Sequence, residues 1–520
     1  SGTGKGGSDF HGKILPQEEL AEILENERKH GKKIVLCHGV FDLLHPGHIR
    51  HFAAAKKLGD LLVVTVTQDK HVNKGPGRPA FTDTLRAESI AALENVDFVA
   101  INRHPTAVEA IRTLKPHLYV KGQDYENRPG DITHGIYAEE AALKEVGGDI
   151  QFTHDITFSS TNILNSHFGV YPETARQFLS EFRTRVDADG LIAQLSSLKD
   201  LKVLVVGDTI VDEYVYCQPM GKSPKETIVT TRYLNQEAFP GGILACANHI
   251  AALSDNVEMV TCLGRKDSKR ELIETQLNSK IKAHFFYRDD APTVVKRRFV
   301  EPAFLTKMFQ LTELTDTDLP PDVSQQIIRF LETELPKFDL VVVADYGHGF
   351  LNAEIRQVLM KSSRFLALNV QTNSANIGYN LITKYQAADY ICIDEPELRL
   401  AMQRRHSPIK NLIAEFSQSY PDSAITITRG HNGSVTALPS NGANGIEFYE
   451  TPSLSTKIVD RVGAGDAYLA ITSMLAARNF PAETMGFVGN AAGAMAVEVV
   501  CNRSSMQAVP LFKFLKALLA

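Results

Sequence analysis

Two stretches of the chain begin with a short apolar run that ends in a polar, glycine-containing turn. The first run is Lys33–Cys37, before a His-Gly pair, and the second is Lys202–Val206, before a Gly-Asp pair. Uninterrupted runs of this kind, rich in Val and Ile, are typical of strands buried on both faces of a parallel sheet. We therefore expect a sheet to begin near each run.

Apolar runs and helical patterns alternate after both of these expected strands. The expected helices of the N-terminal part cover 49–58 and 84–94, and its further strands cover 61–66, 98–101 and 117–120. The further strands of the C-terminal part cover 340–344, 365–370, 390–393 and 424–428. This alternation predicts an α/β fold class, with a doubly wound, Rossmann-like N-terminal domain followed by a second α/β domain.

Two patterns outside the expected sheets predict a lid and a linker. Residues 226–233 and 293–311 alternate β-branched with charged side chains, which predicts a small antiparallel β lid over the second sheet. The stretch 173–198 is polar and helical in pattern, so we place the domain junction there. The expected parts are an N-terminal extension (residues 1–30), a first domain (31–168), a helical linker (169–198) and a second domain (199–520).

Length and charge exclude several classes of function. With 520 residues, the chain needs more than one hydrophobic core. Its formal net charge of −6 provides no basic surface for nucleic acid and no polybasic arm for a membrane. No apolar run approaches the roughly 18 residues that span a bilayer, and the cysteines are scattered without a C-x-x-C pair. We therefore predict a cytoplasmic protein with neither nucleic acid nor a membrane as a partner.

A histidine pair follows the first expected strand. His45 and His48 are three residues apart at the start of a predicted helix, with Pro46 in its first turn. This spacing puts both imidazoles on one side, next to free backbone N–H groups at the positive end of the helix. Such a position suits a nucleoside triphosphate, because attack on its α-phosphorus needs donors rather than a protein nucleophile. An H-x-x-H pair alone also fits a metal site or two surface histidines.

The longer string from Gly39 to His48, G-V-F-D-L-L-H-P-G-H, resembles the signature of the cytidylyltransferase-like superfamily. The resemblance covers about residues 33–164 and implies catalytic roles for His45, His48 and Lys74. The implied nucleotide-binding residues are those that match the other motifs of that family: Gly39, Phe41, Asp42, Arg86, Lys121, Ser159, Ser160 and Thr161. The hydroxyls of the last three would hold phosphates at a helix start, although a plain helix N-cap has the same pattern.

The base of the nucleotide stays open between adenine and cytosine. Cytidylyltransferases of the glycerol-phosphate type carry an Arg just before the serine-threonine motif, whereas residues 154–158 contain none. In this detail the segment is more similar to an adenylyltransferase, which favours ATP over CTP.

A glycine-rich turn near the end of the chain predicts a phosphate site. Gly463–Gly465 opens a helix and is followed directly by Asp466. Such a turn presents N–H groups to an anion, and an Asp within it can accept a proton from an attacking sugar hydroxyl. Gly clusters also make ordinary helix turns. The longer string D-x-x-G-A-G-D resembles the second signature of the ribokinase (PfkB) family, which implies that Asp466 is the catalytic base.

Further segments follow the order of that family. Asp345–Gly349 resembles its D-Y-x-K-G segment. The resemblance implies sugar-binding residues Asp208, Asp212, Gly241, Gly242 and Lys296, and residues that organise Mg²⁺ through water, Asp394 and Glu397. The implied nucleotide-binding residues are Thr428, Gly430, Gly433, Gly463, Ala464, Gly465 and Asn490.

Two departures from that pattern concern the sugar. Ala245 stands where heptose-type enzymes carry a substrate-contacting Asn, and Asn369–Gln371 replaces their D-P-K. A polar group that binds a hydroxyl cannot be exchanged for a methyl group without changing which sugar fits. The phosphoryl-transfer residues are therefore expected to be intact and the sugar pocket to be rebuilt.

The two joined halves resemble bifunctional kinase/adenylyltransferases that make ADP-heptose for lipopolysaccharide or capsule, with the order of the domains reversed. The resemblance implies a sugar 1-kinase and a sugar 1-phosphate nucleotidylyltransferase, with ATP and Mg²⁺ as cofactors, a sugar phosphate as substrate and a homodimer formed through the lid. One alternative is a kinase/cytidylyltransferase that makes a CDP-linked sugar or polyol. Another is a regulatory or binding protein with one degenerate head.

Overall fold

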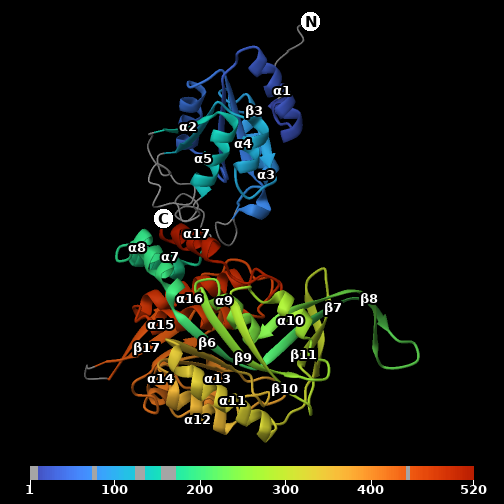
Figure 1. Ribbon diagram of the computed structural model, residues 1–520, viewed down its shortest axis with the longest axis vertical. Helices are drawn as coiled ribbons and strands as arrows, with labels where there is room; N and C mark the ends of the chain where they lie inside the picture. Colours follow the sequence, from blue (N-terminus) through green and yellow to red (C-terminus); the bar gives the residue numbers. More distant parts are fainter. Residues whose placement is uncertain (1–9, 73–78, 123–134, 154–170, 441–444) are drawn as a thin grey trace. The chain divides into compact units, whose positions relative to one another are not determined.

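The computed structural model describes residues 10–72, 79–122, 135–153, 171–440 and 445–520. The chain forms two compact units, residues 1–170 with 512–520 and residues 171–511 (Figure 1). Helices α7 (Glu173–Phe182) and α8 (Ala188–Ser196), which cover the expected linker, belong to the second unit. Within the described residues, no helix is both long and apolar enough to cross a membrane.

The first unit contains a five-stranded parallel sheet in the order β3-β2-β1-β4-β5, which confirms the doubly wound fold. Its strands are β1 (Ile34–Gly39), β2 (Leu61–Thr67), β3 (Phe98–Asn102), β4 (Leu118–Gly122) and β5 (Asp149–Thr153). The strand order reverses between β1 and β4. In open α/β sheets a crevice for ligands forms at such a point, outside the carboxyl ends of the strands.

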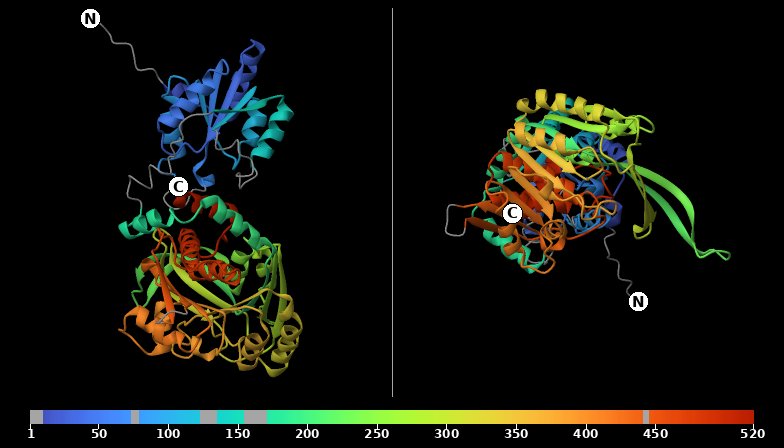
Figure 2. Two further views of the ribbon diagram at one scale, coloured as in Figure 1. Left: turned by 90° about the vertical axis from the view of Figure 1, so that its left-hand side faces the viewer. Right: turned by 90° about the horizontal axis from the view of Figure 1, so that it is seen from below.

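Helices cover both faces of this sheet (Figure 2). Val35 and Cys37 of β1 face a core shared with α2 (Pro46–Lys56) and α3 (Asp83–Ala91). Ile34 and Leu36, one residue out of step, face the core on the other side, because side chains alternate along a strand. The helices of that side are α1 (Gln17–Lys29), α4 (Val108–Leu114) and α5 (Gly135–Val146). Helix α1, in the expected N-terminal extension, contributes Leu20 and Leu24 to this core.

The second unit contains a nine-stranded sheet in the order β10-β9-β6-β13-β14-β15-β16-β17-β18. It is parallel from β10 to β16 and antiparallel beyond β16. Its strands are β6 (Lys202–Gly207), β9 (Asn256–Gly264), β10 (Ile281–Arg288), β13 (Leu340–Asp345), β14 (Leu366–Val370), β15 (Tyr390–Asp394), β16 (Ala424–Thr428), β17 (Ser434–Pro439) and β18 (Ile446–Thr451). The order reverses between β6 and β13, which again marks a ligand crevice.

Two groups of helices cover this sheet (Figure 1). On one face lie α9 (Ile243–Ile250), α15 (Ala464–Ala477) and α16 (Ala482–Ala496). On the other face lie α11 (Pro321–Glu334), α12 (Ala353–Ser362), α13 (Glu395–Met402) and α14 (Ile409–Ser417). The remaining helices are α10 (Arg270–Gln276), α17 (Ala508–Leu519) and the short 3-10 helices η1 (Phe10–Lys13), η2 (Asp69–His71), η5 (Ser197–Asp200), η6 (Leu335–Lys337), η7 (Ile382–Lys384) and η8 (Gly430–Asn432).

A separate four-stranded sheet in the order β12-β11-β7-β8 forms the lid. Its strands are β7 (Thr209–Lys222), β8 (Val229–Gly242), β11 (Val294–Glu301) and β12 (Thr306–Glu313). The hairpins β7–β8 and β11–β12 are antiparallel, but β11 pairs with β7 in parallel. The prediction of a wholly antiparallel lid was therefore wrong. Between the two hairpins the chain passes through β9 and β10 of the main sheet, and it returns along the direction of β7.

Candidate active sites

The histidine pair of the first unit lies at the start of α2, beside the reversal point of the sheet. His45 is the N-cap residue, and its Nδ1 accepts a hydrogen bond from the Gly47 amide at 3.1 Å. The rings of His45 and His48 stack with centroids 3.9 Å apart, and the Phe41 ring meets His48 edge-on at 5.3 Å. The structure thus brings both imidazoles to the helix N-terminus, where the backbone favours anions.

The residues around this pair shape the turn that carries it. Phe41 has a φ of 46°, which is uncommon for a residue with a side chain. A Cβ on Gly39 would lie 2.9 Å from the Phe41 ring, so only glycine leaves room for that ring. The buried Asp42 accepts a hydrogen bond from the Ala80 amide at 2.5 Å. Gly39 and Asp42 therefore hold the turn together, whatever contacts they make with a nucleotide.

Arg86, expected to bind the nucleotide, is buried and engaged with the protein. Its guanidinium donates to the carbonyls of Thr67 (2.8 Å), Phe81 (2.9 Å) and Val40, and pairs with Asp69 at 2.6 Å. In this structure Arg86 ties β1, β2 and the start of α3 together. A direct contact between Arg86 and a nucleotide stays a prediction.

On the other side of the reversal point, the charged residue Lys121 lies near the end of β4. Lys121 forms a buried ion pair with Glu139 of α5 at 2.5 Å. The half-buried His38 near the end of β1, which belongs to no motif predicted from the sequence, has its Nδ1 at 2.9 Å from the Thr65 hydroxyl. Burial, reinforced by Lys121, lowers the pKa of His38 to about 3, so this imidazole is neutral.

The expected site residues Lys74, Ser159, Ser160 and Thr161 lie outside the described residues.

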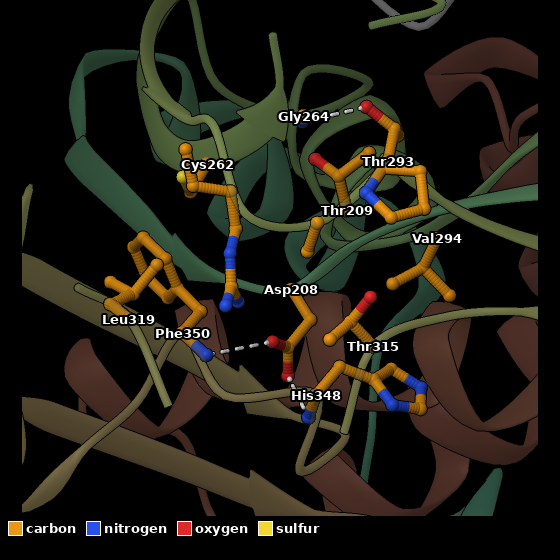
Figure 3. A pocket seen from close by; sticks show the side chains of 13 residues that line it. Asp208, Thr209, Cys262, Gly264, Thr293, Val294, Thr315, Leu319, His348 and Phe350 are labelled. Carbon is orange, nitrogen blue, oxygen red and sulfur yellow. Dashed lines mark hydrogen bonds between the residues drawn. The ribbon is translucent and has the colours of Figure 1, made fainter. Parts of the chain in front are cut away.

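In the second unit, Asp208 sits at the reversal point between β6 and β13. Its carboxylate accepts hydrogen bonds from the backbone amides of Tyr346 (2.9 Å), Phe350 (3.4 Å) and His348 (3.5 Å), the last two of which Figure 3 shows. Burial and the neighbouring Asp345 raise the pKa of Asp208 to about 6. The sequence predicts that Asp208 contacts the sugar. In this structure its carboxylate holds the loop after β13.

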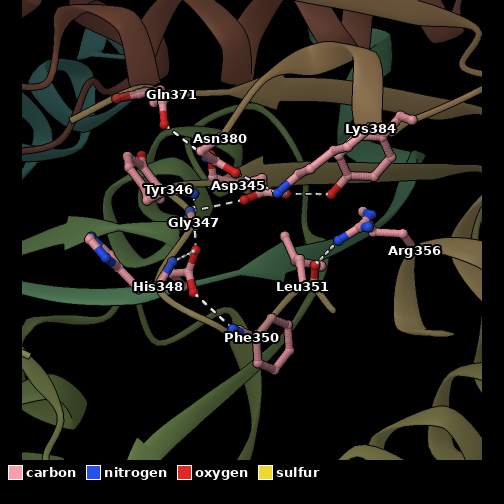
Figure 4. A network of polar contacts seen from close by, with 12 residues as sticks. Asp345, Tyr346, Gly347, His348, Phe350, Leu351, Arg356, Gln371, Asn380 and Lys384 are labelled. Carbon is pink, nitrogen blue, oxygen red and sulfur yellow. Dashed lines mark hydrogen bonds and ion pairs between the residues drawn. The ribbon is translucent and has the colours of Figure 1, made fainter. Parts of the chain in front are cut away.

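The loop after β13 is braced from its other side as well (Figure 4). Asp345 is fully buried and pairs with Lys384 at 2.6 Å, while the Tyr385 hydroxyl donates to the same oxygen at 2.7 Å. The side-chain amide of Asn380 donates to the backbone carbonyls of Asp345 (3.1 Å) and Gln371 (2.9 Å). These contacts give the loop a defined position at the edge of the sheet.

Asp212 and the glycine pair form the junction between lid and sheet. Asp212, on β7, makes an ion pair with Arg298 of β11. A Cβ on Gly241 would lie 2.1 Å from Asp212 Oδ2, so this glycine makes room for the carboxylate. Gly242 has a φ of 57°, in the region that favours glycine. The structure therefore brings Asp212, Gly241 and Gly242 together at this junction, and their contact with a sugar stays a prediction.

Lys296 reaches the same region from β11 of the lid. Its ammonium lies 5.8 Å from the centre of the Tyr346 ring. Burial lowers the pKa of Lys296, and the nearby carboxylates of Asp212, Asp208 and Asp466 oppose that shift. A cation thus lies among the carboxylates that surround the predicted sugar position.

Asp466 lies in the first turn of α15 and is only 8% exposed. Its Oδ1 accepts hydrogen bonds from the Tyr346 hydroxyl at 2.6 Å and from the Gln371 side chain at 3.2 Å. Burial raises the pKa of Asp466 to about 6, although both hydrogen bonds and Lys296 lower it. A buried carboxylate with a pKa near neutrality suits a general base.

The predicted metal residues form the capping box of α13. The Asp394 carboxylate accepts from the Glu397 amide at 2.8 Å, and the Glu397 carboxylate accepts from the Asp394 amide at 3.0 Å. Glu397 also accepts from the Thr372 amide at 3.1 Å. Burial and the adjacent Asp394 raise the pKa of Glu397 to about 8. The surroundings of these two carboxylates disfavour their ionised forms. A nearby divalent cation would stabilise the ionised forms, so the pair suits such an ion.

The expected nucleotide-binding residues of the second unit lie on turns and one buried helix. Gly433 has a φ of 76°, and a Cβ there would lie 1.9 Å from the Thr451 carbonyl oxygen. It follows η8, which begins at Gly430, and Thr428 ends β16. The Asn490 side chain on α16 donates to the Ser434 hydroxyl at 2.9 Å.

The turn before α15 depends on glycine. Gly463 has a φ of 90°, and a Cβ there would lie 2.1 Å from Asn502 Oδ1. Ala464 begins the helix, and a Cβ on Gly465 would meet nothing within 4 Å. The first amides of α15 are thus presented beside Asp466.

The departures from the family pattern have structural counterparts. Ala245 is buried in α9, and the Asn369 side chain donates to the Cys392 carbonyl at 2.8 Å, within the sheet.

His348, at the position of the lysine in D-Y-x-K-G, is 5% exposed. Neither of its ring nitrogens has a hydrogen-bond partner among the described residues. His348 lines a cavity of about 30 Å³, room for about one water molecule, together with Asp208, Thr209 and Thr315 (Figure 3).

Residues 200–508, more than half of the chain, match the model of the pfkB family of carbohydrate kinases, so the chain belongs to this family. Residues 36–164 match the cytidylyltransferase-like family. Among curated proteins, the chain is 46% identical to the bifunctional protein HldE of Gluconobacter oxydans over 116 residues, which are 22% of this chain and 24% of that protein. It is 40% identical to the protein of the same name from Desulfatibacillum aliphaticivorans over 159 residues, 30% of this chain and 31% of that protein.

The chain therefore spans about a quarter to a third of the length of these curated relatives. Among solved structures, the ribokinase of Thermotoga maritima superposes with a TM-score of 0.49 at 18% identity, over 61% of this chain and 99% of that chain.

Proposed function

We propose that this protein is a bifunctional enzyme of nucleotide-sugar synthesis. The second unit transfers the γ-phosphoryl group of ATP to the anomeric hydroxyl of a sugar phosphate, which gives a sugar bisphosphate and ADP. A separate phosphatase reaction must then remove the phosphate that the sugar carried at the start. The first unit joins the remaining sugar 1-phosphate to a nucleoside monophosphate and releases pyrophosphate. The observation that carries this proposal is the buried Asp466 carboxylate beside the glycine turn of α15. The resemblance to heptose kinase/adenylyltransferases supports an ADP-heptose-like product for cell-surface polysaccharide.

In the kinase reaction, Asp466 accepts the proton of the attacking sugar hydroxyl. The first amides of α15 face the negative charge of the transferred phosphoryl group, and donors of this kind stabilise charge in the transition state. Lys296 and Arg298 supply cations for a phosphate group that the sugar already carries. Both cations lie on β11 of the lid.

Mg²⁺ fits the half-buried pair of Asp394 and Glu397, whose raised pKa values favour a nearby cation. Because the side chains are engaged in the capping box, they would hold the ion through water. When bound, Mg²⁺ neutralises charge on the triphosphate oxygens.

In the first unit, the tautomer of His45 determines what this residue offers the nucleotide. His45 Nδ1 accepts from the Gly47 amide, so a neutral ring carries its proton on Nε2. Nε2 can then donate to an oxygen of the α-phosphate. His48, stacked on the same ring, supplies a second donor.

The proposal is tested by measuring ADP and pyrophosphate release separately across a panel of sugars and sugar phosphates, each with ATP and with CTP. The proposed function predicts ADP release with one class of sugar phosphate, and pyrophosphate release with the corresponding 1-phosphate. Pyrophosphate from CTP alone would make the product a CDP-linked sugar or polyol. Absence of either release would contradict a bifunctional enzyme.

The pKa of Asp466 predicts how the kinase depends on pH. A general base must be ionised, and the pKa of Asp466 is raised to about 6. We expect kcat/KM for ADP release to be constant above that pH and to fall about tenfold for each pH unit below it. Initial rates at subsaturating sugar and saturating Mg²⁺ measure this profile. A rate that rises towards acid pH would contradict the role of Asp466.

His348 is expected to contribute to the choice of sugar. No described residue forms a hydrogen bond with the buried His348 ring, so a substrate hydroxyl that reaches the ring would relieve the cost of an unpaired buried polar group. We expect His348→Ala to raise KM for the preferred sugar about tenfold, with a smaller change in kcat. His406→Ala, on an exposed loop of the same unit, is the control. An unchanged ranking of sugars in the panel would contradict this role.

Exposed apolar side chains on the lid support the homodimer that the family resemblance implies. Phe304 and Phe309 are 88% and 56% exposed, and Tyr233 on the β7–β8 hairpin is 60% exposed. Burial of such side chains against a second copy would remove apolar surface from water. Both reactions use nucleoside triphosphates, which supports the cytoplasmic location expected from the sequence.

A further inference from the structure

The two oxygens of the Asp466 carboxylate differ in their partners. Oδ1 accepts both the hydrogen bond from the Tyr346 hydroxyl, at 2.6 Å, and that from Gln371 Nε2, at 3.2 Å. Within the part of the chain that the structure describes, no hydrogen bond reaches Oδ2. One oxygen is thus occupied and the other is left for a ligand.

Both donors to Oδ1 are themselves held in place. Tyr346 donates its backbone amide to Asp208 at 2.9 Å, and its carbonyl accepts from Asn376 at 2.9 Å. Gln371 donates its amide to the Asp345 carbonyl at 2.8 Å, and its own carbonyl accepts from Asn380. Because these backbones are fixed at the ends of the adjacent strands β13 and β14, the two side chains approach the carboxylate from defined directions.

We propose that Tyr346 and Gln371 are positioning residues that occupy Oδ1 of Asp466, so that Oδ2 takes the proton of the sugar hydroxyl. The inference rests on the proposed kinase activity. In the step, the O–H bond of the hydroxyl breaks and its proton moves to Oδ2. The hydroxyl oxygen forms a bond to the γ-phosphorus, and the bond from that phosphorus to the bridging oxygen of ADP breaks.

The surroundings of Asp466 explain why a neutral amide at position 371 matters. The charged and titratable groups that face the carboxylate are Lys296 of β11, Asp212 of β7, Cys246 of α9 and Tyr346. Burial and Asp212 raise the pKa of Asp466, whereas Tyr346, Gln371 and Lys296 lower it. Gln371 donates a hydrogen bond without adding a positive charge, which leaves the carboxylate a stronger base than an ammonium at that position would.

The test uses three variants of the full-length chain: Gln371→Met and Tyr346→Phe, which each remove one donor, and Gln371→Lys, which adds a cation. The readout is the acid limb of kcat/KM for ADP release at saturating Mg²⁺. Loss of a donor is expected to move the limb to higher pH, and the added cation to move it to lower pH, each by about one unit. Gln325→Met and Gln325→Lys, on the exposed side of α11, are the matched controls and should leave the limb in place.

A structural role alone would not move the limb in opposite directions at one position. If Gln371→Met and Gln371→Lys shift the limb in the same direction, or leave it in place, the inference is overturned. The Gln371 pair decides this even if Tyr346→Phe does not fold. If the unmodified chain releases no ADP with any sugar, the proposed kinase function fails instead, which is a distinguishable result.

Discussion

Replacing Asp466 by asparagine is expected to reduce ADP release by about 10³-fold, because an amide cannot accept the proton of the sugar hydroxyl. Asparagine has nearly the same shape as aspartate and keeps an oxygen that can accept from Tyr346, so the fold should be preserved. Pyrophosphate release from ATP and a supplied sugar 1-phosphate should stay unchanged, because Asp466 belongs to the second unit.

The two releases are measured in separate coupled assays on the same preparation. Asp422→Asn, on an exposed position of the second unit, is the matched control and should retain both activities. If Asp466→Asn keeps ADP release within tenfold of the unmodified chain, Asp466 is not the general base. If the variant loses both releases, the two reactions do not have separate sites.

The complementary change, His48→Ala, is expected to reduce pyrophosphate release by about 10²- to 10³-fold, the effect of losing one donor that follows charge in a transition state. Its ring stacks on His45, so its loss also loosens the second imidazole at the start of α2. ADP release should be unaffected. The assay supplies a sugar 1-phosphate directly, so that the kinase does not limit it.

His30→Ala, at an exposed position after α1, is the control for the first unit. Pyrophosphate release by His48→Ala close to that of the control would exclude His48 from the reaction. A fall in ADP release would show that the two heads are not independent.

The doubly wound fold of the first unit was predictable because its signals are local. Apolar runs gave β1 to β4 within one or two residues of their observed ends. The helix start at Pro46 placed both histidines together. Leu20 and Leu24 of α1 are four residues apart, a spacing that puts both on one helical face towards the core.

The contacts of Arg86 and Asp208 could not be inferred from sequence. A motif shows that a charged side chain is present near a ligand, but not whether it faces the ligand or the backbone. The donors of Arg86 go to carbonyls of three separate segments, and Asp208 caps a loop that begins 138 residues later. Such contacts depend on how distant segments pack.

The positioning residues of Asp466 were missed for the same reason. Tyr346 and Gln371 are separated from Asp466 by 120 and 95 residues, and they meet it only because β13 and β14 end beside the start of α15. Gln371 stands where the family pattern has the lysine of D-P-K, which indicates that the function of this position differs from that in the family. The parallel pairing of β7 with β11 was likewise invisible, since it depends on the path through β9 and β10.

We propose that one chain carries two transfer reactions of the same synthesis. The most direct test incubates the unmodified protein with ATP and Mg²⁺, in one reaction with the preferred sugar phosphate from the panel and in a second with the corresponding sugar 1-phosphate, and follows ADP, pyrophosphate and the masses of the sugar products. The proposed function predicts a sugar bisphosphate with about one equivalent of ADP in the first reaction, and a nucleoside diphosphate sugar with about one equivalent of pyrophosphate in the second. Failure of either product to form would contradict it.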